Sequence, residues 1–141
     1  IGYNFRITEL QTAIGVAQLS KLESFVNRKK EIYNIYKNNL KNVKFVRIFS
    51  FNASGDICPH RVIIMTEKSE ALMSHLSSVG VGVRTLFMPM HSQPIYNQEG
   101  NFPVTEKLFS EGICLPSAPS LSDSQVVFIC DEIKNIIEGL Q

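Results

Sequence analysis

The stretch VKFVRIFSFNASGDICPHRVIIMT, residues 43–66, bears most directly on the fold because it holds two short runs rich in β-branched residues. We expect strands at 43–48 and 61–66, separated by a polar loop that contains glycine. This loop is too brief for the crossover that would join parallel neighbours. The two runs therefore favour an antiparallel or mixed sheet.

The segment after these runs predicts a helix, a strand and a long loop. Residues 67–79 predict a helix that Gly80 ends from a C-cap position. A third strand should cover about 81–87, and the stretch 88–102, which contains prolines and shows no periodicity, should be a loop. Long ordered loops in compact domains tend to be functional. The helix is expected to bury Ala71, Leu72, Leu76 and Val79.

The carboxy-terminal segment predicts two more helices and a short strand. Pro103 suits the first turn of a short helix that should end at Gly112, followed by a brief apolar strand at 113–115. Ser122 and Gln125 form a capping-box pattern that starts a closing helix. The short helix that begins at Pro103 is expected to bury Val104 and Leu108. The closing helix is expected to bury Val126, Ile129, Ile133, Ile137 and Leu140.

The amino-terminal segment predicts one long helix, which begins at the capping-box pair Thr8 and Gln11 and ends near residue 42, with a bend near Ser24. Small residues near its start imply close packing against another part of the domain, another domain or another subunit. The basic run at 28–31 is interpreted as a solvated outer face without function. With the elements above, this gives an α+β fold: a small antiparallel or mixed sheet packed with helices.

Composition restricts the class of protein. A chain of 141 residues that is 44% hydrophobic and 19% charged fits one globular domain with a real core. A formal net charge of +1 disfavours nucleic acid as a partner. The three cysteines show no metal-site spacing, and no apolar run approaches the ~20 residues of a membrane span. We expect a cytoplasmic protein with no metal site and no membrane partner.

Three features carry possible chemistry, although no segment supplies a complete catalytic set. Asn4 and Arg6 precede the first helix and suit a phosphate, or else a turn and a surface ion pair. His91 and Gln93 lie in the proline-flanked loop, where the histidine suits a proton shuttle or a donor to sugar hydroxyls, or else a cap on a backbone carbonyl. Arg84 is on the strand before that loop. It suits an ion pair with an anionic substrate, or else it simply lies on the solvent-exposed face of the sheet.

Four blocks in order resemble the carboxy-terminal third of the DegT/StrS sugar aminotransferases, with the perosamine-synthase-like members the most similar. They are GYNFRITELQTAIG at 2–15, PMHSQPIY at 89–96, FPVTEK at 102–107, and LPS before the PSLS helix start at 115–122. Together they cover essentially the whole chain. The resemblance implies that residues 1–141 form the carboxy-terminal small domain of a fold-type I enzyme, with 1–42 as a long connecting and interface helix region.

The resemblance also implies a reaction and its cofactor. Such enzymes use pyridoxal 5'-phosphate to move an amino group from an amino acid, usually L-glutamate, to a nucleotide-linked keto sugar for amino-sugar and cell-surface polysaccharide synthesis. They work as homodimers, here expected to form through the first helix. The residue matching Asn4 reaches the cofactor phosphate of the other subunit, and His91, Arg6, Gln93 and Arg84 are expected to contact substrate.

The Schiff-base lysine of the family belongs to the large domain, upstream of Gly2, so no catalytic residue is expected in this chain. The lysines present, such as Lys21, Lys30 and Lys134, fall on helical positions expected to be solvated. Since the chain begins at Ile1 with a helix signal close behind, we expect it to be an inactive piece of a longer polypeptide. An apolar helix face should then remain uncovered.

Two alternatives remain. A free-standing α+β module that binds a small molecule or a partner protein would show a first helix with a polar exposed face. A non-catalytic family member would scaffold a sugar pathway or regulate transcription.

Overall fold

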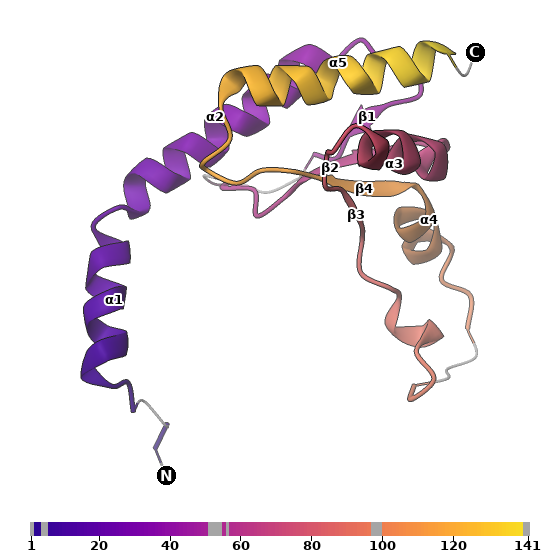
Figure 1. Cartoon of the computed structure of the whole chain (residues 1–141). Coiled ribbons are helices and arrows are strands. Elements are labelled where there is room, and N and C mark those ends of the chain that lie inside the picture. Colours follow the sequence, from indigo (N-terminus) through magenta and orange to yellow (C-terminus); the bar gives the residue numbers. More distant parts are fainter. Residues whose placement is uncertain (1, 4–5, 51–54, 56, 97–99, 140–141) are drawn as a thin grey trace.

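The computed structural model describes residues 2–3, 6–50, 55, 57–96 and 100–139. Within these residues the fold is α+β, as expected (Figure 1). No helix in this part of the chain is long and apolar enough to cross a membrane. The elements in order are α1 (Glu9–Leu19), α2 (Leu22–Leu40), β1 (Arg47–Ile48), β2 (Val62–Met65), α3 (Ser69–Ser78), β3 (Arg84–Thr85), the 3-10 turn η1 (Met90–Ser92), α4 (Pro103–Glu111), β4 (Gly112–Leu115) and α5 (Asp123–Gly139).

The sheet is antiparallel throughout its four strands, which lie in the order β1-β2-β4-β3. β4 lies between β2 and β3, and all four of its residues are buried. Cys114 pairs with Ile63 on one side and with Arg84 on the other. Directly opposed residues share a face of the sheet, so these three side chains lie on one face and Ile64 and Ile113 lie on the other.

The core lies on the face of the sheet that α2, α3 and α5 cover (Figure 1). α2 contributes residues spaced four apart, which places them on one stripe of the helix. Burying one such aliphatic side chain stabilises the fold by roughly 1.5–3 kcal/mol. The core residues from α2 are Ile32, Tyr36 and Leu40, those from the central strands are Val62, Ile64, Ile113 and Leu115, and those from α3 and α5 are Leu72, Leu76, Val126, Ile129, Cys130, Ile133 and Ile137.

Tyr36 joins α2 to the segment that follows β4. Its side chain is fully buried, and its hydroxyl donates a hydrogen bond of 3.0 Å to the carbonyl of Pro116. Burial raises the pKa of the Tyr36 phenol far above its ordinary value, so the group stays a donor. The bond satisfies a hydroxyl that would otherwise be costly to bury.

The amino-terminal helical region is two helices, so the prediction of one long helix was wrong. The break falls at Ser20 and Lys21, before the bend expected near Ser24. The Ser20 hydroxyl donates to the carbonyl of Ala17 at 3.0 Å, and the Ser24 hydroxyl donates to that of Lys21 at 2.8 Å. Such local side-chain bonds compete with the helical ladder and interrupt it.

No residue of α1 is buried. The capping box between Thr8 and Gln11 forms as predicted, so the helix begins at the expected place. α1 projects away from the sheet and the other helices (Figure 1). The close packing that its small residues implied is therefore absent within the described part of this chain. Its exposed apolar residues are Leu10, Ile14, Val16 and Leu19.

The other elements agree with the prediction in order, and most are shorter, whereas β4 begins one residue earlier than expected, at Gly112. The strands expected at 43–48 and 81–87 shrink to the pairs Arg47–Ile48 and Arg84–Thr85. Gly80 ends α3 with a positive φ of 80°, and the Gly80 and Val81 N–H groups donate to the Ser77 and Leu76 carbonyls.

Several residues of the predicted helices face outward. The expected inward positions Ala71, Val79 and Val104 are exposed, because α3 buries only Leu72 and Leu76 and α4 buries no residue. Ser122 and Gln125 make the predicted capping box at the start of α5. Leu140 lies outside the described residues.

The basic run at 28–31 is not a simple solvated face, which corrects the sequence interpretation. Arg28 pairs with Asp123 at 2.7 Å and donates to the Leu121 carbonyl at 2.6 Å. Lys29 is also engaged, with carbonyls of the segments around β2 and β4. The residues that Arg28 and Lys29 contact outside α2 are distant in sequence, so helical periodicity did not reveal these contacts.

We expect Gly112→Ala to destabilise the chain by about 1–3 kcal/mol, as overpacking does in a tight site. A Cβ at Gly112 would meet the Leu108 carbonyl oxygen at 2.5 Å and would also overlap the Leu86 side chain. Urea unfolding followed by circular dichroism measures the change. Gly82→Ala is the control, because a Cβ there meets nothing within 4 Å. Equal effects of the two substitutions would contradict the steric argument.

Candidate functional site

The loop between β3 and α4 is ordered by its own short-range hydrogen bonds at η1. The buried Pro89 precedes η1, and its carbonyl accepts from the Ser92 hydroxyl at 2.7 Å. The Gln93 N–H donates to the Met90 carbonyl at 3.1 Å. This turn fixes the backbone on both sides of His91.

His91 is held by two side chains from the end of the loop and from α4. Its ring stacks on Phe102 with centroids 4.4 Å apart and planes inclined by 25°. Its Nε2 lies 3.3 Å from a carboxylate oxygen of Glu106, and 16% of the His91 side chain is exposed. Its described partner is thus a carboxylate rather than a backbone carbonyl, an arrangement that orients an imidazole for proton transfer or hydrogen bonding.

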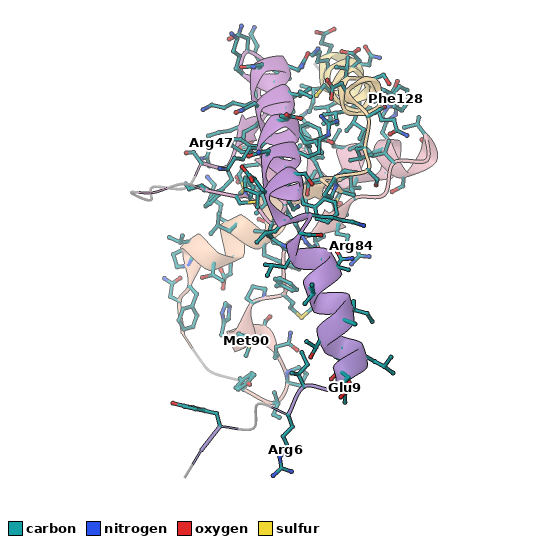
Figure 2. The ribbon with its side chains drawn as sticks, turned by 90° about the vertical axis from the view of Figure 1, so that its left-hand side faces the viewer. Arg6, Glu9, Arg47, Arg84, Met90 and Phe128 are labelled. Atoms are coloured by element: carbon teal, nitrogen blue, oxygen red, sulfur yellow. The ribbon has the colours of Figure 1, made fainter. Side chains whose placement is uncertain are left out.

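The remaining predicted site residues are spread over three places. Gln93 shares the loop of His91 and is half-buried, whereas Arg84 is exposed on β3. Arg6 is exposed just before α1 and makes no described contact with the loop. Figure 2 shows Arg6 and Met90 in the lower half of the view, with Met90 level with α1 and Arg6 below it. Asn4 lies outside the described residues.

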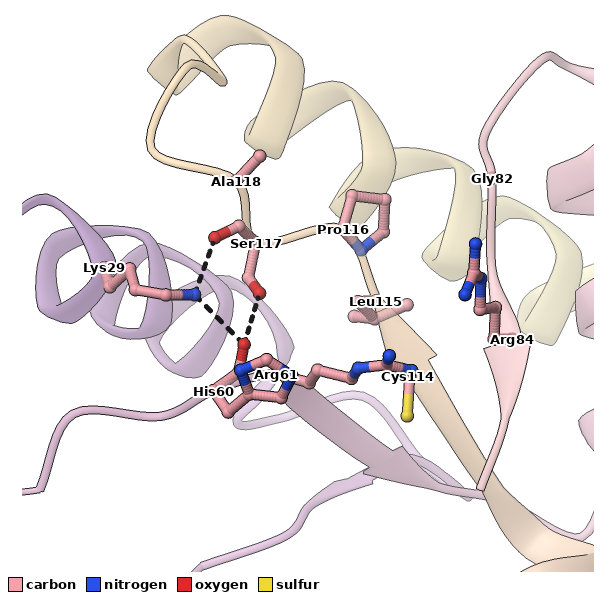
Figure 3. Close-up of a pocket in the computed structure, with 10 residues that line it drawn as sticks. All are labelled: Lys29, His60, Arg61, Gly82, Arg84, Cys114, Leu115, Pro116, Ser117 and Ala118. Atoms are coloured by element: carbon pink, nitrogen blue, oxygen red, sulfur yellow. Dashed lines mark hydrogen bonds between the residues drawn. The ribbon is translucent and has the colours of Figure 1, made fainter. Parts of the chain in front are cut away.

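Arg84 lines a pocket of about 430 Å³ at the end of the sheet where β4 leaves it (Figure 3). Lys29, His60 and Arg61 contribute further basic side chains to its wall. The Lys29 ammonium donates to the His60 carbonyl at 3.0 Å and to the Ser117 carbonyl at 3.2 Å, which ties α2 to both flanking segments. We call this the basic pocket.

Sequence reasoning did not bring Lys29, His60 or Arg61 into the site. The alternation of the second strand was the available signal for Arg61, because it stands one residue before Val62 and therefore faces away from the core. The contacts of Lys29 with residues 31 and 88 positions away had no local signal.

The cysteines contribute no metal site in the described part of the chain, where no three His, Cys, Asp or Glu side chains gather. All three are free, with Cys58 exposed and Cys114 and Cys130 buried. Burial raises the pKa of the Cys130 thiol to about 12. Because the thiolate is the reactive form, Cys130 is a packing residue.

The fold matches part of solved aminotransferase structures. It superposes on the aminotransferase TlmJ from Streptoalloteichus hindustanus with a TM-score of 0.88 and 28% identity, covering 93% of this chain and 36% of that one. DesV of S. venezuelae, solved in complex with a ketimine intermediate, gives a TM-score of 0.88 at 25% identity over 94% of this chain and 37% of that one.

The chain belongs to the DegT/DnrJ/EryC1/StrS aminotransferase family, whose model matches residues 1–134. GDP-perosamine synthase of Escherichia coli O157:H7 is 38% identical over 135 residues, which cover 94% of this chain and 37% of that protein. The chain thus spans little more than a third of the length of this relative. The expected family and the partial coverage are confirmed.

Phe102→Ala should loosen the loop around His91, because it removes the ring on which the imidazole stacks. An aromatic pair contributes about 0.5–1.5 kcal/mol, so we expect amide hydrogen exchange at 89–96 to rise roughly two- to tenfold. Exchange measured by mass spectrometry reports this directly. Val104→Ala, on the exposed side of α4, should leave the same peptide unchanged. A loop equally protected in both variants would show that Phe102 does not hold it.

Proposed function

We propose that residues 1–141 form the carboxy-terminal small domain of a pyridoxal-phosphate-dependent aminotransferase that moves an amino group from L-glutamate to a nucleotide-linked keto sugar. The observation that carries the proposal is the family match over residues 1–134. The name of the E. coli relative, a GDP-perosamine synthase, supports a sugar substrate linked to a nucleotide. Amino-sugar synthesis for a cell-surface polysaccharide, in the cytoplasm, stays a prediction.

The exposed face of α1 favours this proposal over a free-standing binding module. Leu10 is 80% exposed, Leu19 68% and Ile14 64%, whereas the module hypothesis predicted a polar face. Several large apolar side chains on one isolated helix indicate a surface that another polypeptide surface covers. The remainder of a longer enzyme and a second subunit both suit that role.

The residues present suit the phosphate-binding part of a cofactor site. The amide of Asn4 and the guanidinium of Arg6 are donors suited to the phosphate, and we propose that Asn4 binds it across a dimer. Pyridoxal phosphate, when bound, supplies an electron sink for the carbon that exchanges the amine. The described lysines are exposed, partly exposed or engaged, as Lys29 is with carbonyls and Lys134 with Asp131 at 2.8 Å. We therefore propose that the Schiff-base lysine lies outside this chain.

We propose that the loop of His91 contacts the sugar. Glu106 and Phe102 fix the imidazole, so His91 can present a hydrogen-bonding nitrogen to a hydroxyl without losing much side-chain entropy. Gln93, from the same loop, supplies both a donor and an acceptor. Arg84 and Arg6 are the residues suited to anionic parts of the substrates.

Activity tests the proposal. The complete polypeptide that contains residues 1–141 should convert L-glutamate and a nucleotide-linked keto sugar to 2-oxoglutarate and the amino sugar when pyridoxal phosphate is added. The 141-residue chain alone should release no 2-oxoglutarate, and borohydride reduction with the cofactor should leave no stoichiometric lysine adduct. An adduct at one lysine of the short chain would place the nucleophile here. A complete polypeptide that binds the cofactor without turnover would favour the non-catalytic alternative.

We also propose a homodimer through α1, and the double variant Leu10→Ser/Ile14→Ser tests it. The complete polypeptide should sediment as a dimer, and the variant should shift toward the monomer because it loses two buried apolar contacts of roughly 1.5–3 kcal/mol each. Val104→Ser on α4 is the matched control, since Val104 is similarly exposed at 71%. A variant that remains as dimeric as the control would place the interface elsewhere.

A further inference from the structure

Two arginines line the basic pocket, and the strand register puts one of them, Arg84, on the face of the sheet opposite the core. Arg84 is opposite Cys114, which is opposite Ile63 on the far side of β4. Arg61 directly precedes β2, and its side chain lines the basic pocket with Arg84 and Cys114. The core helices cover the other face. Figure 3 shows the Arg61 guanidinium beside Cys114 and the Arg84 guanidinium farther from it, along the segment that carries Gly82.

The charges of these arginines are not balanced within the described part of the chain. No carboxylate there pairs with Arg61 or Arg84, although Arg28, Lys107 and Lys134 all have acidic partners. Two like charges that line one pocket repel each other, and a bound anion would relieve this repulsion. Lys29 and His60 line the same wall, so the basic pocket concentrates positive potential in a concave site.

A second pocket of about 340 Å³ adjoins the basic pocket and is mainly apolar. The two share His60, Arg61 and Cys114, so they form one continuous surface. The Phe87 ring lines the second pocket and is 89% exposed, with the Arg61 guanidinium 5.9 Å from its centroid. An aromatic ring exposed beside a cationic site is a stacking platform for a planar base.

We propose that the two pockets bind a nucleoside diphosphate group, with the diphosphate on Arg61 and Arg84 and the base against Phe87. A diphosphate offers adjacent charged oxygens to two planar guanidiniums, whereas an amino-acid carboxylate offers one charge and leaves the apolar pocket empty. The chain runs from Arg84 on β3 through Phe87 to His91, so a linked sugar has a short path to the loop. Identifying the ligand as the nucleotide part of the sugar substrate rests on the proposed function.

Calorimetric titration of the 141-residue chain tests the pocket without cofactor or turnover. GDP should bind more tightly than inorganic diphosphate, and both more tightly than L-glutamate or guanosine. Arg84→Gln and Arg61→Gln should each weaken GDP and diphosphate about tenfold or more, as expected for a lost charged hydrogen bond. Phe87→Ala should weaken GDP by a similar factor and leave diphosphate unchanged.

Matched controls separate this pocket from general charge and apolar effects. Arg47→Gln removes a charge from β1, and Phe45→Ala removes an exposed ring just before β1. Both residues line a different pocket, which shares no residue with either of the two pockets, and Figure 2 shows Arg47 away from Arg84. Neither control should change GDP affinity more than about twofold, and Arg84→Lys should fall between wild type and Arg84→Gln. Circular dichroism confirms that each variant is folded.

Three results would overturn the proposal: an equal loss in Arg47→Gln, tighter binding of glutamate than of diphosphate, or no GDP binding at millimolar concentration. These results test the pocket separately from the proposed transamination. A chain that binds GDP through Arg84 while the complete polypeptide lacks activity would retain the pocket and refute the proposed reaction. An active polypeptide whose Arg84→Gln variant keeps its affinity for GDP would support the proposed reaction and refute the pocket.

Discussion

The arrangement of this chain depends on the pairing of β4 with β2 and β3 at once. All four residues of β4 pair with β2, Ile113 and Cys114 also pair with β3, and every residue of β4 is buried. At Gly112 the neighbouring backbone of α4 comes so close that no side chain fits. This double pairing decides which side chains join the core and which face away from it. Arg84 and Cys114 lie on one face because this register places them opposite each other. The last turn of α4 can lie against β4 because Gly112 has no side chain.

The segments around the basic pocket are positioned by hydrogen bonds that originate on α2. Tyr36 reaches the carbonyl after β4 from the buried side of the helix, and Lys29 reaches two further carbonyls near the surface. Arg28 holds the start of α5 through Asp123 and the Leu121 carbonyl. One helix thus fixes the ends of two strands and the entry to the closing helix. Unpaired carbonyls at these chain turns would be costly, so the bonds serve both packing and the site.

Local signals made part of this structure predictable. The capping boxes at Thr8 and Ser122 and the helix end at Gly80 formed as expected, because their bonds join residues only three to five positions apart. The break at Ser20 was missed, since apolar spacing continues through it. The basic pocket was largely missed, because its members come from α2, β2, β3 and the segment after β4. Arg84 and His91 were singled out by type and position in the chain, while their neighbours Arg61, Phe102 and Glu106 became evident only in three dimensions.

The two-residue interruption between α1 and α2 gives the amino-terminal helix a pivot. α1 has 11 residues and no buried side chain to anchor it to the core. At about 1.5 Å per residue it is roughly 16 Å long, so a rotation of about 20° at the pivot would swing its far end by roughly 6 Å. A polypeptide bound to α1 would move together with this helix. The backbone angles of Ser20 and Lys21 therefore set how far any polypeptide bound to α1 stands from the loop of His91.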